Sequence, residues 1–273
     1  MKRILLLAAG IIVPLIYALK IVPQQVCIPI SDRRHLPQGI YDTLKKYRAI
    51  LIGEMHGTKE SPEFVDGMVN LWLNSGEKVL LGLEMSKSTQ GKIDSFMSTG
   101  DFTPVKKSPF FYGTFKSGIS SVAMADLIKS FYKKPNVKIV CICNDRYYPN
   151  TDWDSTMAVN EINALKDNPG YKLITLTGNL HNKMEPDKFG TPMGYRLYRI
   201  PHIGLKKEEI ASVDVVYDGG TAWNCAPDCG IHKQEIQGDW HSICNCDNFF
   251  TISMDGRIIL YTKNVTASLP LNP

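Results

Sequence analysis

Apolar residues recur along the chain in two alternating patterns, continuous runs and stretches in which they are three or four positions apart. Continuous runs predict strands covered on both faces, and the spaced stretches predict amphipathic helices. The predicted strands are residues 49–52, 79–84, 137–143, 173–177, 212–217 and 257–261. The predicted helices are residues 61–75, 122–132 and 154–166. This alternation is typical of an α/β domain with a mostly parallel sheet covered by helices on both faces.

A short motif occurs twice at the ends of predicted strands. Gly53-Glu54-Met55-His56 follows the first strand directly, and Gly178-Asn179-Leu180-His181 follows the fourth. In an open parallel sheet the turns after the strands face a common crevice, so two histidines delivered in this way can converge on one ligand. Glu84 ends the second strand and is expected at the same rim. We therefore predict a site that contains Glu54, His56, Glu84 and His181.

The residue types in this predicted site favour activation of water. Two imidazoles with one or two carboxylates suit zinc, manganese, cobalt or iron, and an open coordination position would hold an acidified water molecule. The metal ligands would then be Glu54, His56, His181 and Glu84, with Asn179 matching Glu54 in the second turn. Without a metal, His56 can act as a general base oriented by Glu54 or Glu84.

Composition and charge narrow the classes of partner. The 273 residues are 44% hydrophobic and 21% charged, and the formal net charge is +4. No basic cluster is dense enough to follow a phosphate backbone, so we expect no nucleic acid partner. No long polar linker divides the chain, which predicts one domain over residues 24–273.

Residues 1–23 are predicted to be a signal peptide or a membrane anchor. Lys2 and Arg3 precede an apolar stretch over residues 4–19, which is typical of a targeting signal. The stretch is shorter than the roughly 20 apolar residues of a spanning helix, and no clear cleavage pair follows it. Both interpretations therefore stay open. The remainder is expected outside the cytosol, in the periplasm or secreted, with membrane association through this segment as an option.

The seven cysteines fit an oxidising compartment. Cysteines gather in a C-terminal extension over about residues 220–250, and disulfides among them are the simplest interpretation, with three pairings open. A structural zinc site helped by His232 or His241 is the alternative. Cys141 and Cys143 are expected to pack on one face of their strand, which leaves Cys27 without a partner. The four cysteines of the extension are Cys225, Cys229, Cys244 and Cys246.

An aromatic segment interrupts the regular pattern between residues 99 and 121. We interpret Pro109-Phe110-Phe111-Tyr112 either as a lid over the crevice or as a segment packed on the domain, and packing is favoured.

Four blocks in a fixed order resemble the ChaN-like, Tiki and erythromycin-esterase superfamily, with ChaN-like haem-binding uptake proteins closest. The blocks are residues 51–57, 81–85, 154–158 and 177–181, within a core of about residues 45–200. Four ordered blocks are more specific than any one of them. The resemblance implies an α/β core with a site at the strand ends, built on the four residues above. The resemblance also implies that Asp154 and Arg146 lie near the site. Asp152 is an alternative to Asp154 for the same role.

Members of this superfamily use the site in different ways, so the resemblance predicts the location of the site more than the identity of its substrate. Tiki proteins are metal-dependent proteases, erythromycin esterases open a lactone with a histidine-activated water, and ChaN-like lipoproteins bind haem. We therefore predict an extracytoplasmic hydrolase that cleaves an ester or amide in a small molecule or peptide. The alternative is a non-catalytic haem-binding protein for iron uptake, with Tyr112, Tyr147 or Tyr148 as axial ligand.

Overall fold

A computed structural model describes residues 26–112, 118–145, 152–200, 204–225, 228–235 and 237–272. The predicted signal or anchor segment lies outside these residues, as do Arg146, Tyr147 and Tyr148. In the part of the chain that is described, no helix has the length and apolarity needed to cross a bilayer.

The strands form one sheet in the order β1-β8-β9-β6-β2-β5-β3-β4, with β7 paired to β6. The strands from β9 to β4 in this order are parallel to one another. Strand β8 pairs in antiparallel fashion with β1 and β9, and β7 pairs in antiparallel fashion with β6. The described strands are β1 (Val26–Pro29), β2 (Ala49–Glu54), β3 (Lys78–Ser86), β4 (Val137–Cys143), β5 (Tyr171–Gly178), β6 (Ile210–Cys225), β7 (Cys229–Gln234), β8 (Asn248–Ile252) and β9 (Ile258–Val265). The mostly parallel sheet is therefore confirmed.

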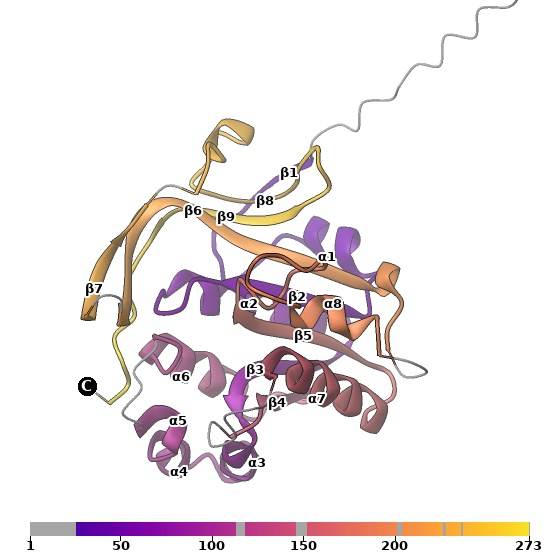
Figure 1. Ribbon diagram of the computed structural model, residues 1–273, viewed down its shortest axis with the longest axis vertical. Coiled ribbons are helices and arrows are strands. Elements are labelled where there is room, and N and C mark those ends of the chain that lie inside the picture. Colours follow the sequence, from indigo (N-terminus) through magenta and orange to yellow (C-terminus); the bar gives the residue numbers. More distant parts are fainter. Residues whose placement is uncertain are drawn as a thin grey trace, which may run out of the picture.

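Helices cover both faces of the sheet, because side chains alternate along each strand. Ile50 and Ile52 belong to a large core with α1, α2, α3 and α6, whereas Ala49 and Leu51 belong to a second core with α7 and α8. Figure 1 shows β1, β8 and β9 at one end of the molecule and α3, α4 and α5 at the other. The described α-helices are α1 (Gln38–Leu44), α2 (Glu60–Asn74), α3 (Gln90–Thr99), α4 (Thr103–Lys106), α5 (Pro109–Tyr112), α6 (Val122–Ser130), α7 (Trp153–Asp167) and α8 (Met193–Leu197).

The aromatic segment 109–112 packs on the domain, as the favoured interpretation predicts. It forms the short helix α5, in which Phe111 is buried and Phe110 packs against the large core. Phe102 and Phe110 both contact the Phe111 ring at edge-on angles. Tyr112 points outward, with 72% of its surface exposed.

The cysteine pairing agrees with the sequence prediction for one disulfide and differs for the other. Cys225 pairs with Cys229 across the β6–β7 hairpin, but Cys244 pairs with Cys27, 217 positions earlier in the sequence. The reason is long-range: β1 adds to β8 in antiparallel register, with Cys27 opposite Thr251. Cys27 is therefore not the unpaired residue, and the predicted zinc site of four C-terminal cysteines does not form.

Cys141 and Cys143 are both buried, but they do not share a face of β4. Cys141 packs in the large core and Cys143 in the core under α7 and α8. The pairing of β4 with β3 is irregular here, because its register shifts between Leu83 and Ser86.

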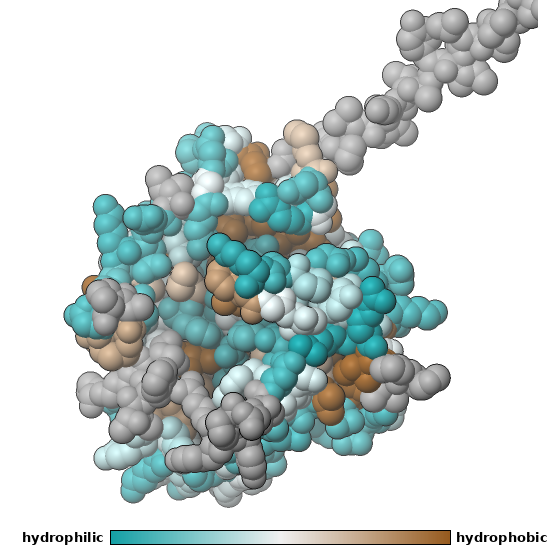
Figure 2. Space-filling view, in the orientation of Figure 1, coloured by the Kyte–Doolittle hydropathy of each residue, from teal (hydrophilic) through white to brown (hydrophobic). Residues whose placement is uncertain are grey.

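Hydrophilic side chains cover most of the face shown in Figure 2. Hydrophobic residues gather there in a few small areas, one of them near β8 and β9, where a small separate core contains Trp240, Phe249 and Tyr261.

Candidate active site

The carboxyl ends of three neighbouring strands form the candidate site. In the parallel pair β2–β5, Glu54 lies opposite Gly178, so the two Gly-x-x-His turns begin side by side. Strand β3, which carries Glu84, pairs with the other edge of β5. The structure thus brings the predicted site residues to one rim because parallel strands end at the same edge of the sheet.

His56 is oriented by a carboxylate from its own strand. Its Nδ1 atom lies 2.9 Å from Oε1 of Glu54, and Glu54 is only 3% exposed. A carboxylate at Nδ1 accepts a hydrogen bond from that nitrogen, which leaves Nε2 without a proton in the neutral ring. Nε2 is the atom that faces the site, 3.5 Å from Oε2 of Glu84.

His181 is oriented in the same way, but by a residue from a distant helix. Its Nδ1 atom lies 2.8 Å from Oδ1 of Asp154, near the start of α7. The backbone N–H of Met193 donates a second hydrogen bond to that oxygen at 2.6 Å. Asp152 has a different role, because its side chain caps α7 by accepting a hydrogen bond from the Ser155 N–H.

Glu84 lies between the two imidazoles and contacts both. Its Oε1 is 3.8 Å from Nε2 of His181, and its Oε2 is 3.5 Å from Nε2 of His56. The backbone N–H of Gly178 fixes the carboxylate by donating to Oε2 at 2.9 Å. Both separations are longer than a direct hydrogen bond. The arrangement therefore presents two Nε2 atoms and one carboxylate to the same small volume.

Glycines at two positions allow close contacts around the two turns. A Cβ atom on Gly178 would lie 3.1 Å from Nε2 of His56, tighter than ordinary packing allows. Gly57 has φ +80°, and its carbonyl accepts hydrogen bonds from the N–H groups of Trp223 and Ser268. The far end of β6, which belongs to the predicted C-terminal extension, therefore packs directly against the His56 turn.

Asn182 is a residue that sequence reasoning missed. It is completely buried, and its Nδ2 donates to Oδ1 of Asp214 at 2.8 Å and to the carbonyl of Val213 at 3.2 Å. These bonds fix the end of the His181 turn to β6. The available signal was its position directly after the second Gly-x-x-His motif, since Asn often forms such side chain–backbone bonds in turns.

Burial and charge change the proton affinity of two site residues in the same direction. Burial raises the pKa of Glu54 above its usual value, and the hydrogen bond from His56 only partly opposes it. For His181, burial lowers the pKa, but the hydrogen bond to Asp154 and the charge of Glu84 outweigh burial and raise it. His181 therefore holds a proton to higher pH than an isolated histidine.

The donor set suits the predicted metal in its chemistry. Both Nδ1 atoms face carboxylates, which is how metal-ligating histidines are usually oriented, and both Nε2 atoms face Glu84. Oε2 of Glu54 is buried and has no hydrogen-bond partner among the described residues. Over the same residues, however, His56, Glu84 and His181 do not bring one donor atom each within 4.8 Å of the other two. Binding an ion would therefore draw the rings inward.

The other predicted candidates lie around this centre or outside it. Asn179 contributes its backbone N–H, which donates to the Glu54 carbonyl at 2.9 Å. Arg146, Tyr147 and Tyr148 fall outside the described residues, and Tyr112 is exposed on α5. The haem alternative therefore stays a prediction.

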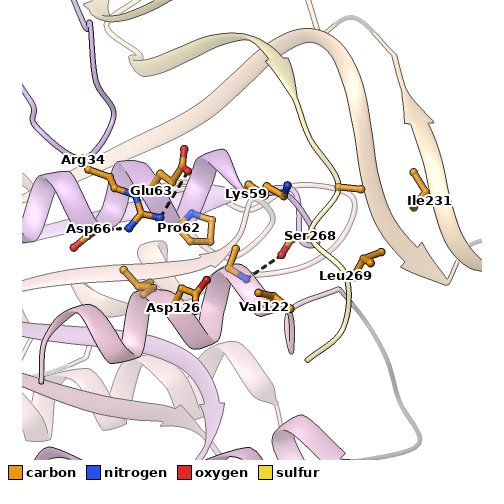
Figure 3. A pocket seen from close by; sticks show the side chains of 13 residues that line it. Arg34, Lys59, Pro62, Glu63, Asp66, Val122, Asp126, Ile231, Ser268 and Leu269 are labelled. Carbon is orange, nitrogen blue, oxygen red and sulfur yellow. Dashed lines mark hydrogen bonds and ion pairs between the residues drawn. The ribbon is translucent and has the colours of Figure 1, made fainter. Parts of the chain in front are cut away.

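A pocket of about 410 Å³ lies beyond the His56 turn, and the site histidines do not line it. Figure 3 shows its two ends: Arg34 forms ion pairs with Glu63 and Asp66 at one, and Val122, Ile231 and Leu269 line the other. The pocket is thus separate from the histidine cluster, although Lys59, on its wall, is only three residues past His56.

Comparisons with known proteins agree with the fold. No protein-family model and no curated protein matches the sequence. Among solved structures, a succinoglycan biosynthesis protein has 10% identity and a TM-score of 0.62, and the match covers 89% of this chain and 95% of that one. Erythromycin esterase EreC in its open conformation has 9% identity and a TM-score of 0.58, over 90% and 95% of the two chains.

ChaN of Campylobacter jejuni, solved with cofacially bound haem, has 14% identity and a TM-score of 0.46, over 71% of this chain and 92% of that one. The succinoglycan biosynthesis protein and EreC therefore share their overall fold with this chain, in agreement with the fold that the sequence resemblance predicted. Identities this low establish a shared architecture and leave substrate and chemistry to the site itself.

Proposed function

We propose that this protein is a hydrolase that uses the histidine pair to activate water for cleavage of an ester or amide bond. One observation carries the proposal: two imidazoles, each with Nδ1 on a carboxylate, present their Nε2 atoms to the two oxygens of Glu84. This is the arrangement that general acid–base catalysis requires, a nucleophile-activating base and a proton donor fixed around one point.

The geometry suggests a role for each ring. A water molecule between the rings would lose a proton to Nε2 of His56 as its oxygen attacks the substrate carbonyl carbon. His181 would then donate its Nε2 proton to the leaving alkoxide or amine, releasing an acid and an alcohol or amine. Glu84, held by the Gly178 N–H, would orient the water and stabilise the imidazolium ions.

The same residues carry the types of donor atom that a divalent ion prefers. His56 and His181 would hold it through Nε2, with Glu84 as the carboxylate ligand, whereas Glu54 lies on the Nδ1 side of His56 and would orient that ring. Such an ion supplies a bound water of lowered pKa and polarises the carbonyl. In either version the protein positions the same two imidazoles around the scissile bond.

We also infer that the protein works outside the cytosol. The Cys27–Cys244 and Cys225–Cys229 disulfides support this location, since such bonds persist in oxidising compartments. The apolar N-terminal stretch predicts export and a place at or near a membrane. The substrate would then be a small molecule or peptide that reaches the periplasm or the medium.

The test is hydrolysis of p-nitrophenyl esters, lactones and short peptides by the full chain and by His56→Asn. We expect wild-type turnover and a loss of about 10³-fold in kcat/KM in the variant. Treatment with EDTA followed by Zn²⁺ or Mn²⁺ separates the two versions: reversible loss of activity identifies the metal-dependent one, and unchanged activity the metal-free one. Equal rates in wild type and His56→Asn, or no hydrolysis of any substrate class, would contradict the proposal.

A haemin titration of the same preparations tests the non-catalytic alternative. A saturable, sharp Soret band in a protein without hydrolytic activity, lost in His181→Asn, would replace the hydrolase assignment with haem binding.

A further inference from the structure

Three cysteines meet at the outer edge of the sheet, far from the histidine site in the strand order. Cys27 comes from β1, and Cys244 and Cys246 follow the short 3₁₀ helix His241–Ile243. Their sulfur atoms all lie within 4.8 Å of one another. Because a disulfide joins only two sulfurs, three cysteines in mutual contact always leave one that is not in the bond.

Local geometry determines which sulfur is closest to the bond. The disulfide joins Cys27 to Cys244, and the sulfur of Cys246 lies 3.1 Å from that of Cys244. The Cys246 N–H donates to the Cys244 carbonyl at 2.7 Å, a tight turn that holds the two side chains together. Cys246 is therefore placed to attack Cys244, with Cys27 as the leaving group.

The surroundings of the cluster limit its reaction with outside thiols. All three cysteines pack with Trp240 and Phe249 in the small core beside β8 and β9. The Cys246 thiol donates a hydrogen bond to the Asn248 carbonyl at 3.4 Å. Burial, and then the charge of Asp247, raise the pKa of Cys246, so its reactive thiolate is scarce. These features favour a slow reaction within the chain over rapid reaction with other molecules.

We propose that Cys27, Cys244 and Cys246 form a thiol–disulfide exchange centre. The Cys246 thiolate forms a bond to the Cys244 sulfur, and the Cys27–Cys244 bond breaks. The electron pair goes to the Cys27 sulfur, which takes up the proton that Cys246 lost. No oxidant or reductant is consumed, because one disulfide and one thiol are exchanged for another disulfide and another thiol.

Exchange changes how the N-terminal strand is attached. In the Cys27–Cys244 form, β1 is tied covalently to a segment 217 positions later in the sequence. In the Cys244–Cys246 form, β1 is held by its ladder with β8 and by the hydrogen bond from Thr251 to the Val26 carbonyl. The centre therefore works as a covalent latch on the edge strand that follows the predicted signal or anchor segment.

Disulfide mapping of the full chain tests this proposal. Protein purified without reductant is quenched in acid to stop exchange, alkylated with N-ethylmaleimide, digested and analysed by mass spectrometry. We expect two populations, one with Cys246 alkylated and one with Cys27 alkylated and a Cys244–Cys246 bond, the second being roughly a tenth or more of the molecules.

Matched variants identify the attacking residue. Cys246→Ser should contain only the Cys27–Cys244 bond, and Cys27→Ser only the Cys244–Cys246 bond. A Cys225→Ser, Cys229→Ser double variant removes the other disulfide and should show the wild-type populations. Alkylation of Cys246 in every wild-type molecule would overturn the proposal. So would alkylation of all three cysteines only after EDTA, because that result identifies a thiolate metal site.

Discussion

The two Gly-x-x-His turns share a sequence spacing and a place in the fold, yet they obtain their orienting carboxylates differently. His56 uses Glu54, two residues earlier on the same strand, at 2.9 Å. His181 uses Asp154, 27 residues earlier at the start of a helix, at 2.8 Å. The first turn is therefore a local unit, whereas the second is completed only when α7 packs against the sheet.

The two orienting carboxylates also differ in their exposure to solvent. The Glu54 side chain is 3% exposed and that of Asp154 is 22% exposed, so ionisation of the first carboxylate costs more. In the local pair the strand positions the carboxylate beside its histidine, so the carboxylate can be buried while the His56 ring stays 25% exposed. A pair that depends on tertiary packing lies nearer the surface, at the N-terminus of α7, where backbone N–H groups favour a negative charge.

Glu84→Gln should have the largest effect on activity, because Glu84 contacts the histidines of both turns. Gln keeps the shape but removes the charge that faces the two Nε2 atoms. We expect kcat/KM for ester hydrolysis to fall by about 10³-fold, with little change in Tm. Glu63→Gln, a glutamate of the separate pocket, is the matched control and should retain wild-type activity. A loss below threefold in Glu84→Gln would remove the shared carboxylate from the mechanism.

A second pair of variants separates the local partner from the distant one. Asp154→Asn and Glu54→Gln should each lower kcat/KM by about 10–100-fold, since each loses the carboxylate that orients an imidazole. Their stabilities should diverge. Glu54→Gln removes a buried carboxyl whose native pKa is raised, so its Tm at neutral pH should exceed the wild-type value. Asp154→Asn should leave Tm nearly unchanged, and equal Tm shifts in both variants would contradict this distinction.

The sequence alone was sufficient for the parallel core and for the convergence of the site. Continuous apolar runs marked β2, β3, β4 and β5, and parallel strands must end at one edge, so Glu54, Glu84 and both histidines could be placed together. These predictions rest on local pattern plus one topological rule. They place the four residues at one edge of the sheet, and the order β2-β5-β3 then brings them together.

Contacts that depend on which elements pack together could not be predicted from the sequence. Asp152 and Asp154 could not be told apart until α7 was oriented, when one capped the helix and the other reached His181. The Cys27–Cys244 bond likewise depends on the addition of β1 to β8, a pairing of segments at opposite ends of the chain. Such long-range antiparallel pairing leaves no signal in local spacing.

The glycines that begin the two turns should differ in sensitivity. An added Cβ on Gly178 would lie 3.1 Å from Nε2 of His56, which a small shift of the ring can relieve. An added Cβ on Gly53 would lie 2.3 Å from Oδ1 of the buried Asn182. We expect Gly178→Ala to lower kcat/KM by about threefold to tenfold at unchanged Tm. Gly53→Ala should instead lower the free energy of unfolding by about 1–3 kcal/mol, and chemical denaturation measures this.

The smallest effect on activity, and a distinct effect on stability, should come from Glu161, a buried carboxyl in α7, the helix that also carries Asp154. Glu161 lies two helical turns after Asp154 in α7, is completely buried, and accepts a hydrogen bond from the Thr175 hydroxyl at 2.6 Å. Burial raises the pKa of Glu161 to about 8, from 4.5, against the opposing effect of Thr175. Between these values the native state holds a proton that the unfolded chain has lost, so stability falls as pH rises through this window.

The variant Glu161→Gln cannot titrate and should lack this loss of stability. Relative to the variant, the wild type should lose on the order of 4 kcal/mol of unfolding free energy between about pH 5 and pH 8. Urea titrations of both proteins at several pH values measure the difference, and ester hydrolysis at each pH should stay within about twofold of wild type, since Glu161 does not touch the site histidines. Parallel stability curves for the two proteins would mean that Glu161 is ionised in the folded state, and that α7, the helix that completes the second turn, accommodates a buried charge.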